Sequence, residues 1–311
     1  FGTTTGLKER FGSERVFDMP TAENGMTGVA IGAALAGLKP VMTHQRVEFS
    51  LLAIEQIVNQ AAKWHYMTAG AMTVPLVVRL IIGRGWGQGP QHSQTLDVYF
   101  AHIPGLKLVA PATPADAKNL LIASIRDQNP VIFMEHRWLH ETIGNVPEKV
   151  TELEIGKAEI VKTGTDITLI SYSYPLLEVL EAAKLLETVG ISSEVLDLRT
   201  LRPMDYQTIC SSVAKTGRVL VVDNGWFEFG VSAEIVARIS EYKFDQLKAA
   251  PRRIGTLSVP IPSTRALANY VYPNVGSILN MVREIIPFEG LHNLEIFETK
   301  DVPNEAFKGP F

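Results

Sequence analysis

The sequence predicts an α/β protein with two open, parallel-rich sheets that carry helices on both faces. Short runs of β-branched residues alternate with helical stretches in two successive series, and this alternation is typical of parallel sheets covered by helices. The chain has 311 residues and is 46% hydrophobic, so it exceeds the roughly 100–200 residues of a single domain. Between the two series, residues 141–156 lose the periodicity and carry glycine, proline and several glutamates, which is typical of a linker.

The first series starts with a glycine- and alanine-rich helix over residues 25–37, which Asn24 can cap through its side-chain oxygen. The elements that follow are a strand over 39–44, a helix over 50–67, a strand over 74–82, a helix over 114–127 and a strand over 130–135. The apolar run at 74–82 fits a buried strand and is far shorter than the roughly 18 residues of a membrane span.

The second series repeats the alternation in a smaller sheet. Its predicted elements are a strand over 166–172, a helix over 175–189, a strand over 193–198, a helix over 205–215, a strand over 218–223 and a helix over 231–242. Past Ile286, few apolar residues keep a register. We therefore predict a first domain over residues 1–150, a second domain over 151–287, and a tail over 288–311 that wraps a surface or trails free.

Composition excludes several classes of function. The 29 basic and 33 acidic residues give a formal charge of −4, and no run of lysine or arginine indicates nucleic-acid binding or a membrane surface. The single cysteine, Cys210, cannot form an internal disulfide, which indicates a reducing compartment such as the cytoplasm or an organelle matrix. Because the chain begins at Phe1 rather than at methionine, we expect its true N-terminus, with any targeting segment, to precede this sequence.

The segment Pro20–Gly28 places one carboxylate, that of Glu23, where a loop opens into the small-residue helix 25–37. Glycine and alanine on the first turns leave room for close approach by a neighbouring chain or a ligand. A carboxyl group held against such an apolar surface can keep a proton and act as an acid. The alternative is that Glu23 only caps or solvates the start of the helix.

A second candidate lies in the loop 83–94, which directly follows the predicted strand 74–82 and contains four glycines and a proline. Open α/β sheets bind ligands at the carboxyl ends of their strands, and long irregular loops in compact domains are usually functional. His92 near the end of this loop can donate a proton or a hydrogen bond near neutral pH. The alternative is a flexible loop with a surface histidine. We expect no helix to begin on the glycines, so the loop is not a phosphate cradle.

Taken in order, these segments resemble the β subunit of the thiamine-diphosphate-dependent decarboxylase component of 2-oxoacid dehydrogenase complexes, of the pyruvate and branched-chain type, in the transketolase superfamily. The matching motifs lie at residues 11–18, 20–28, 55–59, 92–94, 100–105, 127–130 and 197–203. Together they cover roughly residues 1–285. The resemblance implies a pyrimidine-binding domain followed by a domain like the C-terminal domain of transketolase.

The resemblance also implies roles for individual residues. Glu23 would be the acid that protonates the aminopyrimidine ring of thiamine diphosphate, and His92 would face the reacting carbon and steady the substrate. Family members usually place an aromatic residue after the glutamine that follows the strand, where it stacks on the pyrimidine. Here Arg46 follows Gln45, and Phe49 is expected to pack against the cofactor in its place.

Arg46 leaves two interpretations open. Its guanidinium can stack on the cofactor or bind a carboxylate or phosphate of the substrate, with His44 assisting. Alternatively, Arg46 pairs with Glu48 or with an acid of a partner chain.

The sequence contains no Gly-Asp-Gly, the motif with which enzymes of this class hold Mg²⁺ and the diphosphate. In the family, a separate α subunit supplies that half of the site, and two copies of each subunit form a heterotetramer with the cofactor at the α/β contact. The small-residue helix 25–37 would then lie at a subunit boundary. The stretch Asp127 to Asn129 resembles a loop that holds K⁺ in some members, and the alternative is an Asp and an Asn that end a helix before a strand.

Three functions follow. The first is oxidative decarboxylation of a 2-oxoacid with acyl transfer to a lipoyl group, which would bring a lipoyl acyltransferase core as a further partner. The second is half of a split transketolase-like ketol transferase, which Arg46 and His44 favour because sugar phosphates need anion and hydroxyl contacts. The third is a non-catalytic assembly subunit, favoured by the missing aromatic residue and opposed by the retention of Glu23 and His92.

Overall fold

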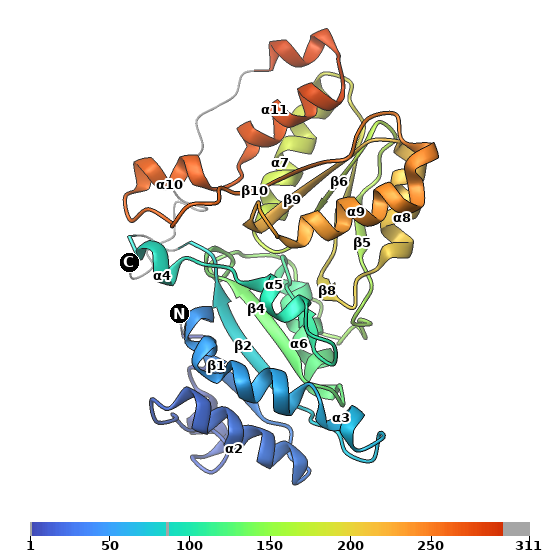
Figure 1. Ribbon diagram of the computed structural model, residues 1–311. Helices are drawn as coiled ribbons and strands as arrows, with labels where there is room; N and C mark the ends of the chain where they lie inside the picture. The colour runs from blue at the N-terminus through green and yellow to red at the C-terminus, as the bar shows by residue number, and fades with distance from the viewer. Residues whose placement is uncertain (1, 85–86, 295–311) are drawn as a thin grey trace.

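The computed structural model describes residues 2–84 and 87–294 and contains two five-stranded sheets with helices on their faces (Figure 1). The strand orders are β1-β2-β4-β3-β8 and β10-β9-β6-β7-β5. Within each sheet, four neighbouring strands run parallel and one edge strand runs antiparallel. The predicted fold class is therefore confirmed.

The first sheet is built mainly from the first half of the chain. Its strands are β1 (Val41–His44), β2 (Val77–Ile82), β3 (Lys107–Val109), β4 (Val131–His136) and β8 (Thr200–Arg202). The first four are parallel, and β8 pairs antiparallel with β3. The apolar sequence of β2 and β4 reflects burial on both faces, as expected for central parallel strands. The edge strand β8 comes from the second half of the chain and was not predicted.

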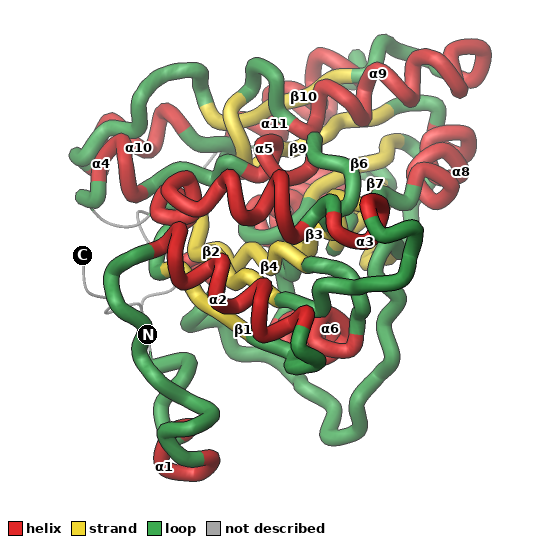
Figure 2. Tube along the Cα trace, turned by 60° about the horizontal axis from the view of Figure 1, so that its bottom comes forward, coloured by secondary structure: helices red, strands yellow, loops and turns green. Residues whose placement is uncertain are grey.

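Six α-helices belong to the described residues of the first half, and two of them are long. They are α1 (Leu7–Phe11), α2 (Glu23–Leu35), α3 (Trp64–Met67), α4 (Gly89–His92), α5 (Asp97–Ala101) and α6 (Pro114–Arg126). The helix α1 buries no residue and projects from the body of the molecule in Figure 2. The helix α2 begins two residues earlier than predicted. Asn24 is therefore not its cap, and the Asn24 side-chain oxygen instead accepts a hydrogen bond from Gln56 Nε2 at 3.0 Å.

The predicted regular helix over 50–67 is irregular. It consists of a 3₁₀ helix (Val47–Ala53), a π-helical turn (Gln56–Ala61) and α3. This segment packs along α2, where a Cβ added at Gly28 would lie 3.3 Å from Gln56 Oε1. Packing against α2 thus competes with the ideal α-helical repeat. Single π-helical turns of this kind frequently occur beside functional sites.

The second sheet consists of β5 (Glu159–Lys162), β6 (Ile167–Ser171), β7 (Ser193–Asp197), β9 (Val219–Trp226) and β10 (Arg252–Thr256). Its helices are α7 (Pro175–Thr188), α8 (Tyr206–Thr216), α9 (Val231–Lys243), α10 (Arg265–Val271) and α11 (Val275–Ile285). The helices α7 and α11 lie on one face and α8 and α9 on the other (Figure 1). Shorter 3₁₀ helices span Arg137–Leu139, Phe244–Gln246 and Glu289–Asn293.

One apolar core runs through both halves of the chain. The face of the second sheet under α8 and α9 shares a single cluster of buried side chains with α2, β1 and β2 of the first half. A separate cluster fills the space beneath α7 and α11, and it includes Leu291, which is fully buried. The start of the predicted tail 288–311 therefore packs on the second sheet, while residues 295–311 lie outside the described residues.

Residues 141–156 contain neither helix nor strand, which agrees with the irregular segment predicted there. None of the helices in the described ranges reaches the length and apolar character of a membrane span.

Candidate active site

The candidate residues gather at the carboxyl edge of the first sheet. His44 ends β1, and the chain continues directly into the 3₁₀ helix that carries Glu48 and Phe49. The loop 83–94, of which residues 85 and 86 lie outside the described part, leaves the neighbouring strand β2 and contains α4 with His92. The two parallel neighbours thus deliver both segments to the same edge, which is the usual ligand-binding edge of an open α/β sheet.

His92 is held by two side chains of the 3₁₀ helix. Its Nδ1 makes a short hydrogen bond with Glu48 Oε1, and the Phe49 ring centroid lies 5.8 Å from the imidazole centroid. The Glu48 side chain is 12% exposed and that of His92 is 40% exposed. The histidine therefore faces solvent or a ligand while its carboxylate partner is largely enclosed. These contacts favour an ordered His92 over the alternative of a flexible loop with a surface histidine.

Arg46 lies beside this pair and is only 7% exposed. Its Nη2 donates a short hydrogen bond to Gln88 Oε1 in the loop 83–94, and its Nη1 has no partner among the described residues. Burial lowers the pKa of the Arg46 guanidinium, and the Glu48 carboxylate offsets part of this effect. The structure joins Arg46 to Gln88, and no ion pair with Glu48 within 4.0 Å occurs in the described ranges.

His44 connects the group to Glu23. The His44 side chain is 5% exposed and its Nε2 has no hydrogen-bond partner in the described part of the chain. Burial lowers the pKa of His44, and the nearby Glu23 carboxylate acts in the opposite direction. Glu23 is the first residue of α2 and is half-buried. The structure thus brings Glu23, His44, Arg46 and His92 to one edge of the sheet, with Gln45 exposed between them.

The second half of the chain anchors the loop that carries His92. Tyr272, which follows α10, donates its hydroxyl to the Ser93 carbonyl at 3.2 Å, and Arg84 Nη1 donates to Asn269 Oδ1 at 3.0 Å. A Cβ added at Gly89, which has a φ of +67°, would lie 2.7 Å from Ser263 Oγ. The short helix α4, which was not expected, begins at this close contact.

Asp127 and Asn129, the candidate potassium residues, lie elsewhere. They follow α6 and precede β4, so they are at the amino edge of the sheet, opposite the group described above. One Asp127 oxygen accepts from the Asn129 backbone at 2.8 Å and from its amide at 3.0 Å, and the other contacts the Lys107 ammonium. Burial acts to raise the pKa of Asp127, but the hydrogen bonds from Lys107 and Asn129 outweigh it and hold that pKa below its usual value. These contacts favour the structural alternative of a capped helix end.

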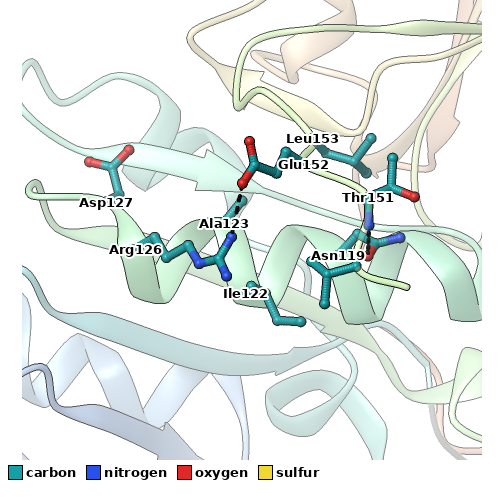
Figure 3. Close-up of a pocket in the computed structure, with 9 residues that line it drawn as sticks. Asn119, Ile122, Ala123, Arg126, Asp127, Thr151, Glu152 and Leu153 are labelled. Carbon is teal, nitrogen blue, oxygen red and sulfur yellow. Dashed lines mark hydrogen bonds and ion pairs between the residues drawn. The ribbon is translucent and has the colours of Figure 1, made fainter. Parts of the chain in front are cut away.

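Asp127 also lines a surface pocket of about 330 Å³ (Figure 3). The pocket lies between α6 and the segment 150–153, where Asn119 Oδ1 accepts from Thr151 N at 3.1 Å and Arg126 pairs with Glu152 at 3.4 Å. No group of three potential metal-ligating side chains occurs among the residues that the structure describes. Because the pocket is lined by α6, Asp127 and the segment 150–153, it is separate from the candidate residues at the carboxyl edge.

Sequence reasoning missed two parts of this arrangement. The first is Gln88, whose position between Gly87 and Gly89 was the only signal.

The second is a buried acid pair, in which the Tyr172 hydroxyl contacts Asp97 Oδ2 closely and Asp223 Oδ1 at 2.6 Å. Burial and the neighbouring Asp223 carboxylate raise the pKa of Asp97 to about 7. No local pattern marks these three residues, because they are far apart in the chain.

Comparison with known proteins identifies both halves. The family models for the transketolase pyrimidine-binding domain and the transketolase C-terminal domain match residues 1–141 and 156–278. A solved chain described as "Split gene transketolase, inactive beta4 tetramer" superposes with a TM-score of 0.73 and 22% identity, covering 92% of this chain and 88% of that one. At that identity, the likeness shows the fold.

Closer relatives carry the name pyruvate dehydrogenase E1 component subunit beta. The protein of Rhizobium meliloti is 42% identical over 287 residues, which cover 92% of this chain but only 62%, less than two thirds, of that relative. The protein of Rickettsia bellii is 39% identical over 285 residues, covering 92% of this chain and 88% of its own length. The mitochondrial protein of Mus musculus is 40% identical over 291 residues, with 92% and 81% covered. The chain therefore belongs to the family of pyruvate dehydrogenase E1 component β subunits, within the transketolase-like proteins.

Proposed function

We propose that this chain is the β subunit of a thiamine-diphosphate-dependent 2-oxoacid dehydrogenase and supplies the aminopyrimidine half of its active site. The observation that carries the proposal is the convergence of Glu23, His44 and the Glu48–His92 pair at the carboxyl edge of the first sheet. These four residues come from α2, β1, the 3₁₀ helix after β1 and the loop after β2. The family relationship and the order of the motifs along the chain support the same assignment.

The side chains present suit a polar, partly aromatic ligand. His44 Nε2 and Arg46 Nη1 are buried and lack hydrogen-bond partners in the described ranges, and buried polar atoms normally have them. The Phe49 ring is half-buried beside His92 and offers an apolar contact. We assign the cofactor contacts to Glu23, Gln45, Arg46 and Phe49.

When bound, thiamine diphosphate supplies the carbon centre that adds to the keto group and stabilises the electron pair left by loss of CO₂. The chain's own residues then bind the substrate and transfer protons. Glu23 holds the proton that is given to the aminopyrimidine ring. Arg46 and His44 hold the anionic group of the substrate, and His92 faces the reacting group with Nε2, which accepts a hydrogen bond or a proton from it.

The remaining half of the site belongs to a partner in this proposal. Because the sequence has no Gly-Asp-Gly, an α subunit holds Mg²⁺ and the diphosphate, and two copies of each subunit assemble. A lipoyl acyltransferase core accepts the acyl group for oxidative turnover. A K⁺ ion at Asp127 and Asn129 would have to displace the Lys107 ammonium from the Asp127 carboxylate. The cytoplasm or an organelle matrix is the proposed compartment.

A second candidate is half of a split transketolase-like ketol transferase. The buried cation Arg46 beside His44 favours it, since a sugar phosphate brings the anion and hydroxyl groups that such side chains bind. The two candidates differ in substrate and share the cofactor. Product analysis with 2-oxoacids and with sugar phosphates distinguishes them.

Calorimetric titration tests the common part of both candidates. Thiamine diphosphate with Mg²⁺ is titrated into the chain alone, into the chain with its α subunit, and into that mixture carrying Glu23→Ala, with the exposed Glu181→Gln as control. We expect heat of binding only when the α subunit is present and turnover to fall at least ~100-fold with Glu23→Ala. If no mixture binds the cofactor, both catalytic proposals are wrong and the assembly-subunit alternative replaces them.

A further inference from the structure

We propose that Glu48 is a positioning residue that sets the proton position and orientation of the His92 imidazole. Only the catalytic consequence of this inference rests on the proposed function. The inference itself rests on the short hydrogen bond between Glu48 Oε1 and His92 Nδ1, which joins the 3₁₀ helix after β1 to the loop after β2.

A carboxylate can only accept hydrogen bonds, so the contact dictates which imidazole nitrogen carries the proton. With Glu48 as acceptor, the neutral His92 ring carries its proton on Nδ1. Its Nε2 then keeps a lone pair directed away from Glu48. The tautomer of a histidine is commonly set in this way by the partner of its other ring nitrogen.

The position of Glu48 is itself fixed. Its neighbours Val47 and Ser50 are 1% and 0% exposed, and Ser50 Oγ donates to the Val47 carbonyl at 2.5 Å. The Glu48 side chain is 12% exposed, so solvent competes little for its Oε1. A partner held this firmly limits the rotation of the imidazole, and the Phe49 ring limits it from a second direction.

The charged and polar groups around Glu48 come from three parts of the chain. The Arg46 guanidinium interacts electrostatically with this carboxylate from the same segment, and both are largely buried. Gln88 of the loop 83–94, which accepts from Arg46, is neutral. From the second half of the chain, the Tyr272 hydroxyl donates to the Ser93 carbonyl at the end of α4. The Glu48 carboxylate therefore interacts electrostatically with the buried Arg46 guanidinium and accepts a hydrogen bond from the His92 imidazole.

Nitrogen-15 NMR of the histidine side chains tests the inference without cofactor or turnover. Spectra are recorded on the labelled chain at a pH where the imidazoles are neutral, and the His92 signals are identified by their loss in His92→Gln. We expect the Nδ1–H form to dominate in the unmodified chain and to lose that dominance in Glu48→Ala. Glu48→Gln keeps the side-chain size if the alanine variant does not fold, and it also reduces the Nδ1–H population because an amide can donate as well as accept.

The exposed Glu181→Gln, on α7, is the matched control and leaves the His92 signals unchanged. Identical His92 signals in the unmodified chain, in Glu48→Ala and in Glu48→Gln would overturn the inference. In the assembled enzyme, we expect Glu48→Gln to lower kcat ~10- to 100-fold with little change in KM. If the NMR change occurs but no assembly turns over any 2-oxoacid or sugar phosphate, the positioning role stands and the proposed function fails.

Discussion

Arg46 is a largely buried cation at the candidate site, only 7% exposed. Arginine is almost never fully buried without a partner, and Arg46 has one neutral partner and one nitrogen with none in the described ranges. A bound anion would complete its hydrogen bonds. In the proposed site, Arg46 is therefore suited to a charged group of the ligand.

Substitution of Arg46 by methionine tests this role. Loss of a hydrogen bond to a charged group costs ~1.5–3 kcal/mol, so we expect kcat/KM for the substrate to fall ~10- to 100-fold, mainly through KM. Steady-state kinetics of the assembled enzyme measures it. The control is Arg126→Met, whose side chain is 60% exposed near the amino edge of the sheet. An unchanged KM in Arg46→Met would show that the guanidinium only holds Gln88 in place.

Single residues also show what local patterns reveal. Glu23 and His92 became candidates because each adjoins a recognisable motif: Glu23 precedes the small-residue helix, and His92 lies near the end of the glycine loop. The contact between His92 and Glu48 was not identifiable, because the two residues are 44 positions apart and meet only when β1 and β2 align. From the sequence, Glu48 was considered only as an ion-pair partner of Arg46.

At the scale of elements, α2 has one buried and one exposed face. Thr27, Ala30, Ile31 and Ala34 are buried against the first sheet and the irregular helical segment. The opposite face carries Gly25, Val29 and Gly32, where Val29 is 62% exposed and a Cβ added at either glycine would meet no atom within 4 Å. Such a face permits close approach of another helix, as the proposed assembly with an α subunit requires.

Replacement of Gly32 by leucine separates folding from assembly. Leucine has a higher helix propensity than glycine by ~0.5–1 kcal/mol and meets no neighbour within the chain, so we expect the thermal stability of the isolated chain to be unchanged or higher. Assembly with the α subunit should weaken at least ~10-fold by analytical ultracentrifugation. Lys184→Leu, on the solvent face of α7, controls for added surface hydrophobicity. Normal assembly of Gly32→Leu would place the partner elsewhere.

Prediction succeeded best for elements whose burial is uniform. The strands at 74–82 and 130–135 were found because parallel central strands are apolar on both faces. The strand at 39–44 was also found, although it is the edge strand β1 and alternates exposed and buried residues. The helix over 50–67 was expected to be regular, yet its π-helical turn depends on contact with α2 through Gln56. Periodicity within a segment contains no information about such a contact.

At the scale of the whole molecule, a buried acid pair joins the two halves. Asp97 begins α5 in the first half, while Tyr172 and Asp223 belong to the second. The Tyr172 hydroxyl has one proton to donate and contacts both carboxyl groups, so the second short contact needs a proton on an aspartate. The raised pKa of Asp97, about 7, agrees with this requirement.

This shared proton makes stability depend on pH. The folded protein retains a proton that the unfolded chain, with an aspartate pKa of 3.8, has released, so stability falls as pH rises from about 4 to about 7. Asp97→Asn supplies the donor permanently. We expect it to be more stable than the unmodified chain at pH 8, by roughly 1–4 kcal/mol, and to have a flatter pH profile over this window.

Urea denaturation at pH 5 and pH 8 measures the difference. The exposed Asp245→Asn is the control and should follow the unmodified chain at both values. An Asp97→Asn variant that loses stability by the same amount at pH 5 and pH 8 would mean that no proton is shared at this contact.

The two-sheet architecture could be inferred from the two series of alternating elements, but the way the halves join could not. The strand β8 is only three residues long, and it leaves the second half to pair with β3. Neither its length nor its composition distinguishes it from a loop.

The position of β8 has a consequence for how the protein is made. The edge strand that covers β3 is synthesised about 90 residues after β3 itself. At ~5–20 residues per second, translation leaves that edge open for roughly 5–20 s, during which its unpaired backbone can bind another extended chain. A newly synthesised copy is therefore most exposed to misassociation, and most dependent on chaperones, before its second half leaves the ribosome.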